Sequence, residues 1–185
     1  MNRRAACLLL AATIATPGPA PGGAPVAGPS LPRAALIDQD GRSVRLDELA
    51  RDRPILLGFF FTGCSTVCPT QTATLRDLQE DLRHDPAPPL LVSVSLDPLG
   101  DTPAAIRGYA DRFELQLGEA SGWLMLTGTA DELAKVWRAF DAAPAGANDH
   151  APVFWLARSG SREWMRKSVF AAPAALARAL REPAS

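Results

Sequence analysis

Apolar residues recur along this chain of 185 residues with two different periods. Short runs that are apolar throughout are typical of strands buried on both faces, whereas apolar steps of three and four predict helices. The apolar runs predict strands over residues 54–62, 89–97 and 122–128 and two further strands within 152–169. Helical spacing and helix-start signals predict helices over residues 67–83, 102–115, 129–143 and 172–184.

Two of the predicted helices begin at recognisable capping residues. Thr102 can accept a hydrogen bond from the first turn, and Pro103 fits the first helical position because no donor is needed there. Thr129 and Glu132 have the spacing of a capping box, in which each side chain bonds the other residue's backbone N–H. These signals place the starts of the helices over 102–115 and 129–143.

The order of the predicted elements indicates the fold class. A turn signal at Asp40 and Gly41, between two short apolar-alternating pieces, predicts an N-terminal β-hairpin over 34–49. Strands and helices then alternate, which indicates an α/β sandwich with largely parallel central strands. A closing antiparallel hairpin followed by a helix resembles the thioredoxin fold. We therefore predict a thioredoxin-like three-layer α/β/α sandwich formed by one domain over 34–185.

The first 33 residues differ from the predicted domain. Residues 1–15 carry Arg3 and Arg4 before an apolar run that is too short to span a bilayer, as in a secretory signal peptide. Residues 16–33 are rich in Pro, Gly and Ala, which predicts a flexible linker. We expect the chain to be periplasmic or otherwise exported, and the alternative is a membrane tether through an uncleaved N-terminus.

Composition and charge exclude one class of partner. Hydrophobic residues make up 47% of the chain, which suffices for one packed core in a chain of this length. The formal net charge is −1, and the sequence contains no long run of basic residues. Nucleic acid is therefore not expected as a partner.

The residues with the clearest chemistry are Cys64 and Cys68 in "FFFTGCSTVCPT", where the first central strand gives way to a helix. Residues four apart share one helix face, and the positive end of a helix favours thiolate over thiol. Thiolates serve sulfur exchange and metal binding alike. The pair therefore predicts a disulfide, a redox couple or the sulfur half of a metal site. A purely structural bridge is the least favoured, because closing so short a loop adds little stability.

Two thiolates form a soft, incomplete metal site that suits Cu(I) or zinc. A structural zinc ion needs four ligands, and the predicted mature chain has no further cysteine. His84 lies at a predicted helix end beside acidic residues and is expected to be an ordinary solvated side chain. His150 lies in "GANDHAPVFW", directly before the closing hairpin, in a loop that faces the redox motif in thioredoxin-like folds. It either reaches the cysteines or is a plain surface histidine.

Other conspicuous residues are expected to have structural roles. Asp97 and Asp101 in "LDPLGD" precede Pro and Thr-Pro, where aspartate usually builds a turn and a helix cap. Trp164 lies on the predicted closing hairpin and is expected to be exposed. The other three tryptophans lie in predicted strands or a helix and are expected to pack in the interior.

Four segments of the chain resemble the SCO/SenC family in order. "FFFTGCSTVCPTQTATL" resembles the family's copper-site segment, and "VSVSLDPLGDTPAAIRGYA" resembles its second strand with Asp-Pro and Asp-Thr-Pro. "GWLMLTGTADELAKVWRAF" resembles its Trp…Thr-Gly segment and the helix after it, and "DHAPVFWLARSGSREWMR" resembles its Asp-His segment. Cys-x-x-x-Cys alone is common, but four matches in register are far more specific.

The resemblance implies copper as the bound metal, one ion per chain, with Cys64, Cys68 and His150 as ligands. It implies a periplasmic or membrane-linked metallochaperone that aids assembly of the copper centre of a terminal (cytochrome c) oxidase. The expected partner is a copper-accepting oxidase subunit or another copper carrier, and the chain is expected to act as a monomer.

Two enzymatic functions are the alternatives to a metal carrier. A thiol–disulfide oxidoreductase would use Cys64 and Cys68 as its catalytic redox pair, keep partner cysteines reduced and need no imidazole. His150 therefore discriminates between the carrier and the oxidoreductase. A peroxidase of the peroxiredoxin type needs Thr and Pro upstream of its reactive cysteine at a spacing that "PILLGFFFTGC" does not match. We expect mainly a metal carrier, in which thiol–disulfide exchange can accompany copper binding.

Overall fold

The structure is a computed structural model, and it describes residues 26–27, 30–49, 51, 53–142, 152–159 and 163–182. The signal segment predicted over residues 1–15 lies outside the described residues. No helix within the described ranges is long and apolar enough to cross a membrane.

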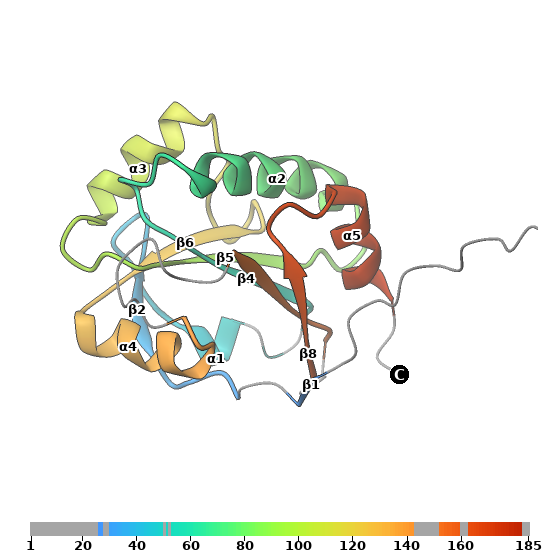
Figure 1. The fold of residues 1–185 in the computed structure, drawn as a ribbon, viewed down its shortest axis with the longest axis horizontal. Coiled ribbons are helices and arrows are strands. Elements are labelled where there is room, and N and C mark those ends of the chain that lie inside the picture. The colour runs from blue at the N-terminus through green and yellow to red at the C-terminus, as the bar shows by residue number, and fades with distance from the viewer. Residues whose placement is uncertain are drawn as a thin grey trace, which may run out of the picture.

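One mixed sheet runs through the centre of the molecule (Figure 1). Its described strands are β1 (Val26–Ala27), β2 (Ala35–Asp38), β3 (Ser43–Arg45), β4 (Ile55–Phe60), β5 (Leu90–Ser95), β6 (Trp123–Thr127), β7 (Val153–Ala157) and β8 (Glu163–Ser168). They lie in the order β1-β8-β7-β4-β5-β6-β2-β3. The three central strands β4, β5 and β6 are parallel, and β7 and β2 flank them antiparallel.

Helices cover both sides of this sheet. They are α1 (Leu46–Leu49), α2 (Val67–Leu82), α3 (Pro103–Arg112), α4 (Ala130–Ala139) and α5 (Pro173–Arg181). α2, α3 and α5 lie on one side, here called the α2 face, and α1 and α4 lie on the other, here called the α4 face (Figure 1). The predicted three-layer α/β/α sandwich is confirmed, and so is the N-terminal hairpin, which is formed by β2 and β3.

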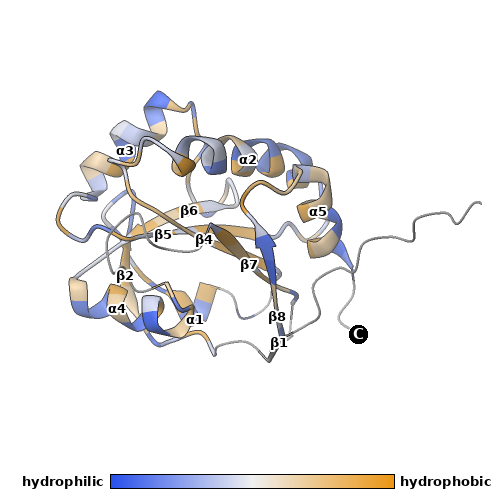
Figure 2. Cartoon of the chain, viewed as in Figure 1, coloured by the Kyte–Doolittle hydropathy of each residue, from blue (hydrophilic) through white to orange (hydrophobic). Residues whose placement is uncertain are grey.

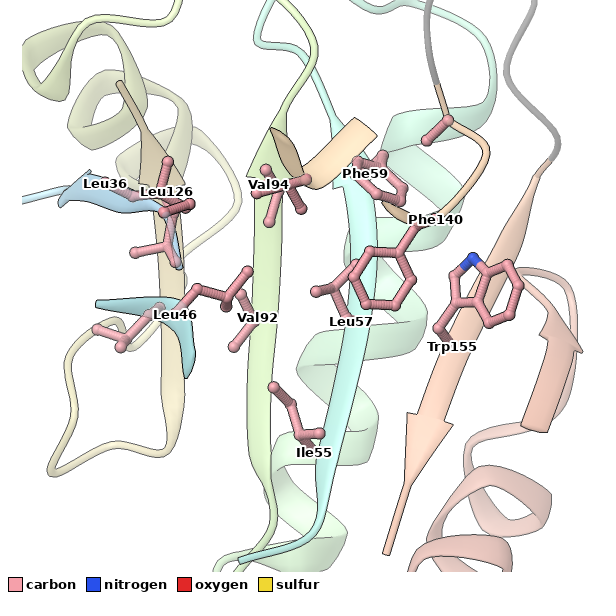
Figure 3. Packing of buried hydrophobic residues seen from close by; sticks show 14 of the residues in the cluster. Leu36, Leu46, Ile55, Leu57, Phe59, Val92, Val94, Leu126, Phe140 and Trp155 are labelled. Carbon is pink, nitrogen blue, oxygen red and sulfur yellow. The ribbon is translucent and has the colours of Figure 1, made fainter. Parts of the chain in front are cut away.

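Each side of the sheet has its own apolar core. Side chains alternate along a strand, so Leu57 and Phe59 of β4 lie in the core of the α4 face, while Leu56 and Phe60 lie in that of the α2 face. Figure 2 shows hydrophobic central strands with hydrophilic residues gathered on the helices and β8. Figure 3 shows the α4 face, where aliphatic side chains of the sheet pack beside Phe140.

The closing hairpin differs from the prediction at Trp164. The sequence predicts an exposed side chain, but Trp164 is only 3% exposed. Its ring packs edge-on against Phe140, with 4.9 Å between the ring centroids. Strand β8 is not an edge strand either, because β1 pairs with it although β1 lies within the expected linker of residues 16–33. The local pattern of β8 could not reveal either neighbour.

The helix caps confirm one prediction fully and one in part. Thr102 accepts a hydrogen bond from the N–H of Ala105 at 3.2 Å, as predicted. Thr129 likewise accepts from the N–H of Glu132 at 3.3 Å. The Glu132 carboxylate, however, accepts from the N–H of Ala35 at 2.9 Å. The predicted capping box is therefore half formed, because Glu132 ties α4 to β2.

Candidate metal-binding and redox site

Cys64 and Cys68 lie where β4 ends and α2 begins, the position that the sequence predicts for them. The loop between the two elements turns at once, since the N–H of Cys64 donates to the carbonyl of Phe61 at 3.1 Å. Cys68 is in the first turn of α2, but Cys64 lies in the loop before it. The prediction that both cysteines share one helix face is therefore wrong in detail, although both sulfurs meet at the N-terminal end of the helix.

The Cys64 sulfur takes the place of a helix-capping side chain. The N–H of Cys68 donates to it at 3.3 Å, and the Thr66 hydroxyl lies 3.8 Å from it. Thr66, the residue before α2, makes no capping hydrogen bond with its own side chain. The first N–H groups of a helix have no partner within the helix and carry partial positive charge. They are therefore suited to stabilise a thiolate at Cys64.

The two thiols differ in acidity and access. Burial by itself raises the pKa of Cys64, but hydrogen bonds to its sulfur from the Cys68 thiol, the Cys68 N–H and Thr66 outweigh burial, and the pKa lies below its ordinary value. Burial and the hydrogen bond to Cys64 raise the pKa of Cys68 to about 12. Cys64 is 9% exposed and Cys68 only 1%. Cys64 is thus the more acidic and the more exposed of the two thiols, and Cys68 is its more deeply buried partner; both cysteines are free.

Buried polar side chains fix the start of α2. The Gln71 amide donates to the carbonyl of Phe59 at 2.8 Å, which ties the helix to β4. The hydroxyls of Thr72 and Tyr109 lie 2.7 Å apart, and the Tyr109 hydroxyl also donates to the Cys68 carbonyl at 3.5 Å. Burial raises the pKa of Tyr109 to about 12, so its hydroxyl keeps its proton. The first turns of α2 are therefore held against both β4 and α3.

Asp101 fixes the loop that carries Cys64. One carboxylate oxygen accepts from the N–H and the hydroxyl of Thr62 at 2.8 and 2.7 Å, and the other accepts from the Ser95 hydroxyl at 2.5 Å. Burial raises the pKa of the Asp101 carboxyl, although these hydrogen bonds favour its charged form. Asp101 thus has a structural role, as expected, but it ties the cysteine loop to β5 instead of capping α3. Asp97 makes the turn, accepting two backbone N–H groups, and Thr102 makes the cap.

The donor set suits a soft metal but is incomplete within the described part of the chain. There, no three His, Cys, Asp or Glu side chains are grouped so as to hold a metal ion. Two sulfurs at one helix end are the donors that Cu(I) or zinc prefers. His150 lies outside the described residues, so its place in the site stays a prediction. His84 is exposed just beyond the C-terminal end of α2, far along the helix from the cysteines, as predicted.

Comparison with known proteins relates this chain to one family. The family profile described as SCO1/SenC matches residues 32–154. The SCO1 protein homolog of Bacillus subtilis (strain 168) is 32% identical over 126 residues, which cover 64% of this chain and 63% of that protein. The chain spans less than two thirds of the length of the curated relatives that it matches.

Solved structures share the fold. BsSco, a member of the Sco family of cytochrome c oxidase assembly proteins in which a disulfide switch was identified, is 25% identical with a TM-score of 0.69. The match covers 86% of this chain and 95% of BsSco. Bradyrhizobium japonicum ScoI, solved with copper bound, is 24% identical with a TM-score of 0.65, over 86% of this chain and 97% of ScoI. The predicted thioredoxin-like fold is confirmed.

Proposed function

The chain belongs to the SCO1/SenC family, and from that premise we propose that it is an extracytoplasmic copper-binding metallochaperone. It takes up one copper ion through Cys64 and Cys68 and passes it on during assembly of the copper centre of a terminal (cytochrome c) oxidase. The observation that carries this proposal is the pair of sulfurs at the N-terminal end of α2, where the Cys64 sulfur accepts a backbone N–H at 3.3 Å.

Copper fits these residues better than a structural zinc ion does. Two thiolates and one further donor satisfy Cu(I), whereas structural zinc sites close with four protein ligands. We assign the third donor to His150, which precedes β7 in the sequence. Copper bound to the structurally similar ScoI of Bradyrhizobium japonicum supports this assignment of the metal.

The proposed partner is a copper-accepting oxidase subunit or another copper carrier. The description of BsSco as a member of a family of cytochrome c oxidase assembly proteins supports this choice. The signal segment predicted over residues 1–15 directs the chain out of the cytoplasm. The chain then acts in the periplasm as a monomer. Exchange of the ion proceeds through Cys64, because it is the more exposed of the two sulfurs.

Thiol–disulfide exchange is the second candidate function. Both sulfurs lie at the N-terminal end of α2, where the N–H of Cys68 donates to the Cys64 sulfur at 3.3 Å, and this proximity supports a reaction between the two cysteines. In this reaction Cys64 and Cys68 lose two electrons and two protons and form a disulfide, while a disulfide of the partner gains them and becomes two thiols. The disulfide switch identified in BsSco favours this chemistry. The same cysteines can serve both functions, since a copper acceptor must itself be reduced.

Metal titration tests the carrier function. The purified chain is reduced, kept free of oxygen and titrated with Cu(I) against a chelator, and bound metal is then measured. We expect one copper ion per chain and loss of binding in the double variant Cys64→Ser/Cys68→Ser. Stoichiometric zinc binding with no preference for copper in competition would overturn the proposal.

A histidine variant separates the two candidate functions. His150→Ala should lower the Cu(I) affinity by more than the ~10–100-fold typical of residues outside the first ligand shell. The reduction potential of the cysteine pair should stay the same, because sulfur exchange depends on thiolate character and access. His84→Ala is the matched control and should change neither value, since His84 is exposed beyond the far end of α2. Unchanged copper affinity in His150→Ala would remove His150 from the site and favour the oxidoreductase.

A further inference from the structure

We propose that Asp101 is a positioning residue for the Cys64–Cys68 pair, because its buried carboxylate holds the loop that carries Cys64 against the end of β5. The inference concerns the same two cysteines as the proposed function and rests on it only to that extent. It requires no copper, since what Asp101 sets is the placement of the sulfurs.

The first step is the attachment of the loop. Thr62 lies two residues before Cys64 and gives both its backbone N–H and its hydroxyl to one oxygen of Asp101, at 2.8 and 2.7 Å. Asp101 is 0% exposed, so water does not compete for these bonds. Hydrogen bonds to a charged acceptor are stronger than neutral ones. The loop is therefore anchored immediately before the reactive cysteine.

The second step is the rigidity of the anchor. The other Asp101 oxygen accepts from the hydroxyl of Ser95, the last residue of β5. The Asp101 N–H donates to the carbonyl of Asp97 at 2.9 Å. Strand β5 lies in the middle of the sheet, paired with β4 on one side and β6 on the other. Asp101 is thus fixed to a central strand that is paired on both sides, and its bonds to Thr62 hold the loop in a set position relative to that strand.

The third step leads from Thr62 to the sulfurs. Phe61, the neighbour of Thr62, has a carbonyl that accepts the N–H of Cys64 at 3.1 Å. The Cys64 sulfur in turn accepts the N–H of Cys68 at 3.3 Å. A displacement of Thr62 therefore shifts the backbone of Cys64 and moves its sulfur relative to Cys68. Release of Asp101 should change the redox balance and the reactivity of the pair, as well as the stability of the fold.

A second buried carboxylate provides a matched control. Asp38 is 3% exposed, and one of its oxygens accepts from the N–H groups of Asp40 and Arg42, both at 2.8 Å. It closes the turn between β2 and β3, and β2 is separated from β4 by β5 and β6. Asp38→Ala removes a comparable set of hydrogen bonds without touching the cysteine loop.

The experiment compares Asp101→Ala, Asp101→Asn and Asp38→Ala in the full chain. The equilibrium of the cysteine pair with glutathione gives its reduction potential, and the rate of Cys64 alkylation gives its reactivity. We expect Asp101→Ala to shift the equilibrium constant about tenfold, which is about 30 mV for a two-electron couple. Asp101→Asn keeps an oxygen that can accept from Thr62, so its reduction potential and alkylation rate should be nearer those of the unmodified chain. Asp38→Ala should leave both values unchanged.

The same reduction potential and the same Cys64 alkylation rate in Asp101→Ala and Asp38→Ala would overturn the proposal. Should Asp101→Ala fail to fold, Thr62→Val removes the hydroxyl bond to Asp101 at nearly constant size. Unchanged reduction potential and alkylation rate in both Thr62→Val and Asp101→Asn would then overturn it. Neither measurement involves copper, so a chain that shows the expected shifts but binds no copper contradicts the proposed function and leaves the role of Asp101 intact.

Discussion

Both faces of the central sheet bury an apolar core, but they differ in the polar groups that they bury with it. The α4 face is filled by aliphatic and aromatic side chains such as Leu57, Leu126 and Phe140 (Figure 3). The α2 face has a similar apolar core along most of its length, but it turns polar at the carboxyl ends of β4 and β5. There it buries Gln71, Thr72, Ser93, Ser95, Asp101 and Tyr109 together with Cys68.

Because of this difference, residues on the α4 face are expected to affect the stability of the fold, and the polar residues near the cysteines are expected to affect thiol chemistry as well. An apolar side chain on the α4 face contributes through burial and packing, which any well-filled core supplies. Each polar group near the cysteines is held by a partner, and removal of one leaves the other buried without a hydrogen bond. Changes on the α4 face should therefore lower stability alone, and changes around the cysteines should alter the thiols as well.

The largest expected contrast lies between the two cysteines of the α2 face. The pKa of Cys68 is raised to about 12, chiefly by burial, while that of Cys64 lies below the ordinary value of 9.0. At a given pH, Cys64 therefore carries the larger thiolate fraction. Alkylation of the native chain, followed by mass spectrometry, should therefore label Cys64 and leave Cys68 free.

The pH profile of that reaction has a defined direction. Only the thiolate reacts, so a lowered pKa means that the rate for Cys64 rises and levels off at a lower pH than for an ordinary thiol. In urea the difference in alkylation rate between Cys64 and Cys68 should vanish, because unfolding removes the environment that each thiol has in the native chain. Two cysteines that react together in the native chain, with the profile of an ordinary thiol, would contradict the assignment of separate roles.

On the α4 face, Leu126→Ala should cost about 2–5 kcal/mol of the free energy of unfolding, because it empties part of a closed core. Leu126 is 0% exposed and lies on β6, two strands away from β4. The measurement is urea unfolding beside the alkylation rate of Cys64 in the folded protein. A changed alkylation rate in this variant would contradict the expectation that changes on the α4 face affect stability alone.

Gln71→Leu should cost less stability but alter the cysteines. It removes the hydrogen bond from Gln71 to the carbonyl of Phe59 at nearly constant volume, and an unpaired buried carbonyl costs about 1–3 kcal/mol. It also loosens the start of α2, so the reduction potential of Cys64 and Cys68 should move.

Gln39→Leu is the control for that variant. Gln39 is 3% exposed and accepts a hydrogen bond from the N–H of Met125 at 3.3 Å, away from the cysteine loop. It should lower stability by a comparable amount and leave the reduction potential unchanged. The same potential in both variants would show that Gln71 has no specific effect on the pair.

The smallest expected effect is at the start of α4. Thr129→Ala removes the hydroxyl that accepts the N–H of Glu132 and should cost about 1 kcal/mol in urea unfolding. Since α4 covers the face away from the cysteines, copper affinity and thiol reactivity should not change. A loss of copper binding in this variant would mean that the two faces are coupled.

The sequence predicts well what depends on neighbouring residues. The apolar run before Cys64 and the helical spacing after it place the strand–helix junction, and both define β4 and α2 within one or two residues. The bond from Asp101 to Thr62 joins residues 39 apart, so no local pattern announces it. A weaker signal was present, because Ser93 and Ser95 interrupt the apolar strand on a single face.

Burial of Trp164 was unpredictable for the same reason. Most of the other residues of its strand are polar, namely Glu163, Arg166, Lys167 and Ser168, which favours an exposed hairpin. The side chain is nevertheless covered by Phe140, and the strand is covered by β1, both distant in the chain. Which elements become neighbours is decided by tertiary packing, and a pattern within one strand does not contain it.

We propose that Cys64 and Cys68 form a single redox-sensitive copper site. The most direct test is to titrate one preparation of the protein with Cu(I), once with the cysteines reduced and once with them oxidised. A disulfide sulfur is a poor metal ligand, because metal binding requires the thiolate. The reduced chain should bind one copper ion, the oxidised chain none, and re-reduction should restore binding. Equal copper affinity in the two states, or two free thiols after air oxidation, would contradict it.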